Sequence, residues 1–206
     1  MKIILGIDEV GRGPWAGPLV VGACVLKEKI EGLTDSKKLS AKRREVLAEE
    51  IQAKAFCGLG WISAEELDQL GLGKALRKAC RLAVEKIQES GASFNEIIID
   101  GTINFLSDTA LAPYVQVLPK ADFLIEEVSA ASIIAKVARD KYMAKEAAIR
   151  FPGYGFEKHV GYGTAAHKAA IEKLGVCPEH RRSFRPIAEV ISTKARGDKG
   201  ESVVAE

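Results

Sequence analysis

Apolar residues fall into short β-branched runs of strand length and longer runs of helical spacing. Glycine, proline or acidic residues bound the short runs, as is typical of buried strands. Their positions predict five strands, at residues 3–7, 19–26, 55–62, 96–100 and 114–118. Helical segments separate most of these strands, which predicts an α/β protein.

Helical spacing marks the segments between the strands. Ser40 is expected to cap a helix. This helix is expected to present Val46, Leu47 and Ile51 on one face. Two further helices are predicted, one opened by a capping box at residues 63–66 and bent or broken at residues 71–73, and one from residue 74 to Ser90-Gly91. The last of these is expected to pack on the sheet.

A long helix is predicted from Asp122 to about residue 149. Its apolar stripe follows intervals of three and four and consists of Leu124, Val128, Ala131, Ala135, Ala138 and Tyr142. Because small residues dominate the stripe, the helix can approach its sheet closely. Thr164 is then expected to cap a short helix that ends at Leu174-Gly175. The predicted catalytic domain covers residues 1–191, and residues 192–206 are predicted to form a disordered tail.

Length and composition fit one globular domain with a substantial core. The chain has 206 residues, of which 47% are hydrophobic. The net charge is only +2, but residues 150–185 contain seven Lys or Arg against three Glu, together with all three histidines. That segment thus carries +4 and the remainder −2. Such a distribution suits a polyanion held near a divalent metal, although a solvated charged surface is the commoner explanation.

Cysteine spacing and hydropathy indicate an intracellular setting. Cys24, Cys57, Cys80 and Cys177 are far apart and include no Cys-x-x-Cys pair, so they are interpreted as ordinary thiols. The chain starts directly with a strand-like run, and no apolar run approaches the length of about 20 residues that spans a membrane. A cytoplasmic protein with no membrane contact is therefore expected.

Acidic residues stand at the ends of two predicted strands. Asp8 and Glu9 follow the first strand, and Asp100 ends the fourth. If these strands are parallel neighbours, Asp8 and Asp100 emerge at the same sheet edge about 5 Å apart. Two carboxylates so placed repel each other unless a proton or a cation lies between them. A metal ion is the candidate partner, and a simple polar turn at each strand end is the alternative.

Three further segments could take part in binding or catalysis, and two of them also have a purely structural explanation. Asp122 begins the long helix, where it could cap the helix or act as another metal ligand. Residues 150–164 interleave four aromatic residues with four glycines, which suits contact with sugars or bases but also an inward-packed loop. Residues 178–186 concentrate positive charge, as phosphate-binding segments do. The residues alone thus indicate an α/β protein with a carboxylate cluster that could hold metal near nucleic acid.

Five motifs, in order along residues 3–187, resemble type 2 ribonuclease H, the ribonuclease HII family. They are residues 8–13 (Asp-Glu-Val-Gly-Arg-Gly), 100–101 (Asp-Gly), 120–122 (Lys-Ala-Asp), 129–140 (Ser-Ala-Ala-Ser-Ile-Ile-Ala-Lys-Val-Ala-Arg-Asp) and 161–164 (Gly-Tyr-Gly-Thr). The resemblance implies an RNase H-like mixed five-stranded sheet flanked by helices, with a helical C-terminal extension. Its first three strands would be antiparallel, and the later strands parallel.

The resemblance also implies a catalytic site and a reaction. Four acids match those of the family, namely Asp8, Glu9, Asp100 and Asp122, and they would bind two Mg²⁺ or Mn²⁺ ions. The implied reaction is endonucleolytic hydrolysis of RNA in RNA–DNA hybrids and nicking 5′ to ribonucleotides embedded in duplex DNA, leaving 5′-phosphate and 3′-hydroxyl ends. Its implied roles are ribonucleotide removal from DNA and primer removal in replication. The alternatives are an inactive nucleic-acid-binding module on the same fold and a related metal-dependent DNA nuclease.

The resemblance also implies which residues recognise the substrate. The backbone of Gly11, Arg12 and Gly13 is implied to touch the 2′-hydroxyl, and Tyr162 to pack near the sugar at the RNA-to-DNA junction. Weaker candidates for phosphate contacts are Lys37, Lys38, Arg181 and Arg182. The implied partners are RNA–DNA hybrid and ribonucleotide-containing duplex DNA, and a monomer is expected.

Overall fold

A five-stranded mixed sheet forms the centre of the molecule in the computed structural model, which describes residues 2–197. The strands are β1 (Ile4–Val10), β2 (Leu19–Leu26), β3 (Ala55–Ile62), β4 (Glu96–Asp100) and β5 (Val115–Leu118). Their order across the sheet is β3-β2-β1-β4-β5. β1, β2 and β3 pair antiparallel, while β4 pairs parallel with both β1 and β5. The predicted sheet is confirmed.

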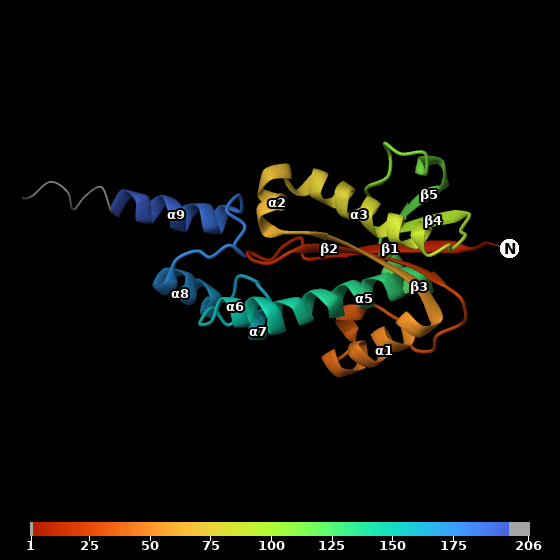
Figure 1. The fold of residues 1–206 in the computed structure, drawn as a ribbon, viewed down its shortest axis with the longest axis horizontal. Coiled ribbons are helices and arrows are strands. Elements are labelled where there is room, and N and C mark those ends of the chain that lie inside the picture. Colours follow the sequence, from red (N-terminus) through yellow and green to blue (C-terminus); the bar gives the residue numbers. More distant parts are fainter. Residues whose placement is uncertain (1, 198–206) are drawn as a thin grey trace, which may run out of the picture.

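Helices cover both faces of the sheet (Figure 1). The α-helices are α1 (Ala41–Lys54), α2 (Ala64–Leu70), α3 (Leu72–Glu89), α4 (Ala121–Leu124), α5 (Glu126–Tyr142), α6 (Ala148–Arg150), α7 (Phe156–His159), α8 (Ala165–Leu174) and α9 (Arg185–Gly197). Two 3₁₀ turns, η1 (Ser36–Lys38) and η2 (Ala112–Tyr114), and a π-helical segment, η3 (Met143–Ala147), complete the order. α3 packs on one face of the sheet, and α5 with α1 packs on the other. No helix among the residues described is long and apolar enough to cross a membrane.

Strand alternation assigns the residues of β1 to the two faces. Leu5 and Ile7 point into the core that α3 covers. Gly6 faces α5 so closely that a Cβ there would lie 2.2 Å from the backbone carbon of Glu127. On β2, a Cβ at Gly22 would lie 2.3 Å from the carbonyl oxygen of Ala131. The expected close approach of the long helix to the sheet therefore depends on glycine in the strands.

Two details of the helix prediction are wrong. Val46 is 47% exposed, because the buried stripe of α1 follows Leu47 and Ile51 one turn apart and Val46 is rotated away by about 100°. The predicted long helix is interrupted at Ile125, whose backbone is extended. Leu124 ends the separate short helix α4 and is 60% exposed, so it does not belong to the buried stripe.

The C-terminal segment is more regular than predicted. The sequence predicts a disordered tail from residue 192, but α9 continues to Gly197, so residues 192–197 are helical. The remainder of that predicted tail, residues 198–206, lies outside the residues described. The predicted boundary at residue 191 therefore falls within α9.

Candidate active site

Asp8 and Asp100 lie at the ends of adjacent parallel strands. Ile7 of β1 stands opposite Ile99 of β4, so the next residue of each strand is one of the two aspartates. Side chains alternate between the two faces of a strand, and Ile7 and Ile99 belong to the core on the α3 face. The side chains of Asp8 and Asp100 therefore point toward α5. The expected convergence at one sheet edge is thus present.

The carboxyl group of Asp8 is buried among negative charge. Its side chain is 7% exposed. Burial, together with the charges of Glu9 and Asp100, raises the pKa of Asp8 to about 8, although a hydrogen bond from Ser132 acts in the opposite direction. The backbone N–H of Glu9 also donates to Asp8 Oδ1 at 2.7 Å. The ionised form of Asp8 is therefore unfavourable unless a positive charge lies close to it.

A strained turn brings Asp122 to Asp100. Lys120 adopts a left-handed backbone with φ of 62°, which is uncommon for a residue other than glycine. This conformation starts α4, and the backbone N–H of Ala121 donates to Asp100 Oδ1 at 2.7 Å. Burial raises the pKa of Asp122, and the charges of Asp100 and Asp35 add to the effect. Asp122 therefore belongs to the same carboxylate group.

Glu9 lies at the same edge but on the other side of the sheet. As the next residue of β1 after Asp8, it points toward α3, where its charge helps to raise the pKa of the buried thiol of Cys80. Its Oε1 accepts from Arg12 Nη1 at 3.0 Å. Burial raises the pKa of Glu9, and Arg12 opposes the shift. The four predicted acids thus divide into three on the α5 side and one, already paired, on the α3 side.

The three aspartates fit hard divalent cations by their chemistry. They offer only oxygen, which Mg²⁺ and Mn²⁺ prefer, and none of them forms an ion pair with a Lys or Arg among the described residues. Within residues 2–197 no group of three or more His, Cys, Asp or Glu side chains is already arranged to hold a metal ion. Magnesium characteristically takes one or two carboxylates and completes its shell with water and substrate phosphate. The three aspartates therefore fit a metal site whose remaining ligands are water and the phosphate of a bound substrate.

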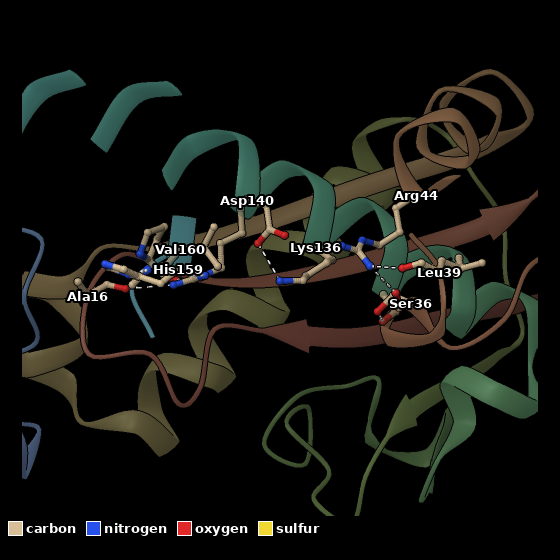
Figure 2. A network of polar contacts seen from close by, with 12 residues as sticks. Ala16, Ser36, Leu39, Arg44, Lys136, Asp140, His159 and Val160 are labelled. Carbon is tan, nitrogen blue, oxygen red and sulfur yellow. Dashed lines mark hydrogen bonds and ion pairs between the residues drawn. The ribbon is translucent and has the colours of Figure 1, made fainter. Parts of the chain in front are cut away.

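The segment with Lys37 and Lys38 is fixed beside these aspartates. Ser36 Oγ lies 3.0 Å from Ser132 Oγ, and Arg44 Nη1 donates to the carbonyls of Ser36 and Leu39 at 2.9 and 2.6 Å (Figure 2). The charge of Lys37 opposes the pKa increase of Asp122. Lys38 Nζ lies 4.2 Å from the ring centre of Phe123 in α4. Both lysines predicted to touch phosphate are thus near the carboxylates.

The two predicted recognition segments lie against each other. Gly11 has φ of +93°, while Arg12 and Gly13 are exposed at the tip of the turn. The backbone N–H of Trp15, just after the turn, donates to the carbonyl of Gly161 at 2.8 Å. Tyr162 follows and is 43% exposed. The chain therefore presents an open glycine turn and an exposed tyrosine ring next to each other.

Arg139 of α5, for which the sequence motifs predicted no individual role, connects these two segments. Its side chain is fully buried, and its guanidinium donates to the carbonyls of Pro18, Ala16 and Val160 at 2.9–3.0 Å. Val160 has φ of 44°, a strained value for a β-branched residue. The signal for this role in the sequence was an arginine among the small, apolar residues of the predicted long helix.

The phosphate contact expected of Arg181 is wrong. Arg181 is fully buried, and its guanidinium donates to the carbonyls of Gly17 at 3.0 Å and Arg12 at 3.2 Å. Burial lowers the pKa of Arg181 to about 9, and the charge of Arg139 contributes. It therefore supports the turn from beneath instead of facing substrate. The contact expected of Arg182, whose backbone N–H donates to Asp68 on α2, stays a prediction.

The three histidines contribute packing to the basic segment. Nε2 of His167 lies 3.1 Å from Nε2 of His180, and the rings of His159 and His167 stack at 4.4 Å. Burial lowers the pKa of both His167 and His180 to about 4. These two side chains are neutral at pH 7, so the positive charge of the segment comes from Lys and Arg.

Ser132→Ala is expected to reduce the activity by roughly 10- to 100-fold, as is common when a group that orients a metal ligand is removed. The hydroxyl of Ser132 bonds to Asp8 and to Ser36, so its loss frees the carboxylate to turn. Initial rates of the cleavage that the family resemblance implies, followed over a Mn²⁺ titration, measure the effect. Ser129→Ala is the matched control, because Ser129 on the same helix donates only to the carbonyl of Thr34. Equal rates for the two variants would contradict the role given to Ser132.

Comparison with known proteins agrees with this arrangement. A family model described as Ribonuclease HII matches residues 5–187. Ribonuclease HII of Polaromonas sp. strain JS666 is 44% identical over 196 residues, which cover 92% of each chain. The ribonuclease H2 structure from Pyrococcus horikoshii OT3 is 25% identical with a TM-score of 0.75, covering 95% of this chain and 100% of that one.

The fold extends to more distant structures. Bst-RNase HIII, solved in complex with Mn²⁺, superposes with a TM-score of 0.72 at 22% identity, covering 95% of this chain and 71% of that one. At that identity the likeness concerns the fold alone. The family match and the close relatives carry the assignment: this chain belongs to the ribonuclease HII family and is an enzyme of the RNase H type.

Proposed function

We propose that the enzyme hydrolyses the RNA strand of RNA–DNA hybrids and nicks duplex DNA 5′ to an embedded ribonucleotide, leaving 5′-phosphate and 3′-hydroxyl ends. The observation that carries this proposal is the register of β1 and β4, which sets Asp8 beside Asp100, and neither forms an ion pair with a Lys or Arg within residues 2–197. Buried carboxylates that repel each other favour a bound cation. The site therefore suits phosphodiester chemistry assisted by metal ions.

Asp8, Asp100 and Asp122 would hold two Mg²⁺ or Mn²⁺ ions, with Glu9 adding negative charge from the α3 side. Such ions supply an activated water and stabilise the leaving 3′-oxygen. The chain itself orients the carboxylates. The Ser132 hydroxyl and the Glu9 N–H bond to Asp8, and the Ala121 N–H bonds to Asp100. Because the donors to Asp8 favour the ionised form of its carboxyl group, they favour ligation by Asp8 as well.

Recognition of a ribose requires contact with its 2′-hydroxyl, which is both donor and acceptor. Arg12 and Gly13 are exposed, and at Gly13 a Cβ would find open space, so the turn is accessible to a sugar. Tyr162 would pack against the deoxyribose that follows. Lys37 and Lys38 would contact the phosphates of the cut strand, and Lys37 also offsets the charge of Asp122.

A DNA duplex with one ribonucleotide tests the proposal. Incubation with Mg²⁺ or Mn²⁺ is expected to give a single nick 5′ to that ribonucleotide, and a chelator is expected to stop it. Mapping of the product ends by mass measures the cut position and the end groups. A matched all-DNA duplex should remain intact. Cleavage of that duplex at a similar rate would identify a DNA nuclease instead, and salt-dependent hybrid binding without cleavage in either metal would identify an inactive binding module.

The cellular role follows from the reaction. We infer that the enzyme removes ribonucleotides from DNA and contributes to primer removal during replication. Its monomeric state and its cytoplasmic location stay predictions from the sequence.

A further inference from the structure

Two cysteine side chains face each other across β2 and β3. Cys24 stands directly opposite Cys57 in the antiparallel register, and their sulfur atoms are 3.7 Å apart. Opposed residues of an antiparallel pair have Cα atoms about 4.5–5.5 Å apart. This lies within the range of about 4.4–6.8 Å that a disulfide spans. Cys80 and Cys177 are buried in two other parts of the core.

The two thiols differ in access and in acidity. Cys24 is fully buried, whereas Cys57 is partly exposed. The thiol of Cys24 donates to the sulfur of Cys57, and this hydrogen bond, with the charge of Lys27, lowers the pKa of Cys57. Burial raises the pKa of Cys24. An oxidant would therefore meet Cys57 first, and Cys24 would be the neighbouring thiol that reacts second.

We propose that Cys24 and Cys57 are a modification site, at which a hydroperoxide forms a reversible disulfide between the two strands. With hydrogen peroxide, the Cys57 thiolate attacks one oxygen and becomes a sulfenic acid as the O–O bond breaks, and the released hydroxide takes a proton to form water. The Cys24 sulfur then attacks the Cys57 sulfur and loses its proton to the departing hydroxyl group, which leaves as a second water. The two thiols lose two electrons in total, and the peroxide gains them.

The disulfide would close a ring around a functional segment. Residues between Cys24 and Cys57 include η1, with Lys37 and Lys38, and the whole of α1. Cross-linking the ends of a loop of this length restricts the unfolded chain, so the oxidised protein is expected to melt roughly 5–10 °C higher than the reduced protein. The inference concerns β2 and β3 alone and does not depend on the proposed nuclease reaction.

Mass spectrometry of the folded, full-length protein tests the proposal. After treatment with hydrogen peroxide, the intact mass is expected to fall by about 2 Da, two of the four free thiols should be lost, and a peptide joining Cys24 to Cys57 should be found. A dithiol reductant should restore all four thiols and the lower melting temperature.

Two variants complete the test. Cys80→Ser, which changes a thiol elsewhere in the core, is expected to form the same cross-link, whereas Cys57→Ser is expected to keep its three thiols under the same conditions. Four free thiols in the wild type at a peroxide concentration that oxidises glutathione would overturn the proposal. A sulfinic acid at Cys57 without the cross-link, or a dimer joined through Cys57, would overturn it equally.

Discussion

Asp8→Asn is expected to abolish cleavage and, at the same time, to stabilise the metal-free protein at pH 7. The amide keeps an oxygen that can accept from the Glu9 N–H and from Ser132, but it carries no negative charge for a metal ion. Loss of several kcal/mol of transition-state stabilisation corresponds to a decrease of at least about 10³-fold in kcat. Single-turnover cleavage of a ribonucleotide-containing duplex measures it.

The stability effect has a defined direction with pH. The pKa of Asp8 is raised from 3.8 to about 8 in the folded protein, so the folded state binds the proton more tightly than the unfolded state. Its contribution is therefore complete below about pH 3.8 and is lost as the pH rises toward 8. Because Asn does not ionise, the variant should exceed the wild type by about 1–3 kcal/mol at pH 7 in a chelator.

Urea denaturation at pH 5, 7 and 8.5 measures this difference. The gap between variant and wild type should widen with pH and shrink when Mn²⁺ is added, because the ion binds only the wild-type carboxylate well. Asp108→Asn is the control, because Asp108 is an exposed acid paired with Arg81 and should show little of this pH dependence. A variant that is inactive but less stable than the wild type at every pH would show that Asp8 is not under electrostatic strain.

Arg139→Met is expected to lower the free energy of unfolding by about 3–5 kcal/mol, the cost of breaking a buried, hydrogen-bonded charged group. Methionine fills much of the volume but leaves the carbonyls of Ala16, Pro18 and Val160 without their donor. Arg139→Lys should recover only part of the loss, because a single ammonium group cannot reproduce the planar fork of three donors. Urea denaturation of both variants measures the change.

A matched control distinguishes the loss of the buried Arg139 contacts from the general effect of replacing an arginine. Arg185→Met removes a side chain that is 90% exposed and forms a surface ion pair with Glu189, so it should change the stability by less than about 0.5 kcal/mol. In the fraction of Arg139→Lys that remains folded, cleavage is expected to weaken through a higher KM, since the turn at Gly11 and the loop at Val160 lose their common support. An Arg139→Met protein within about 1 kcal/mol of the wild type would contradict the role given to this residue.

The sequence was sufficient to predict the sheet and the approach of Asp8 to Asp100, because both depend on local patterns. Short apolar runs that end in aspartate identify β1 and β4, and their parallel pairing then brings Asp8 and Asp100 together. The side of the sheet on which Glu9 lies follows from strand alternation, but only once the face covered by α5 is known. The acidic residues at the strand ends could therefore be identified from the sequence, but their division between the two faces of the sheet could not.

Other features depend on tertiary contacts that no local pattern contains. Arginine is almost always exposed, so composition favoured phosphate binding for Arg181 and gave no role to Arg139. Both are buried because backbone carbonyls from distant loops surround them. Likewise, Cys24 and Cys57 are 33 residues apart, and only the register of β2 and β3 sets them face to face.

Helix α5 fixes the distance between chemistry and recognition. Ser132, which bonds to Asp8, and Arg139, which holds the turn and the Tyr162 loop, are separated by two turns, or about 10 Å along the axis. Figure 2 shows Ala16 and Val160 beside one part of the helix and Ser36 beside another, with Lys136 and Asp140 between them. One residue inserted between these positions would rotate Arg139 by about 100° and move it 1.5 Å. If the enzyme acts as proposed, the length of α5 between Ser132 and Arg139 would set how far from the recognised sugar the strand is cut, and a change in that length would change this distance.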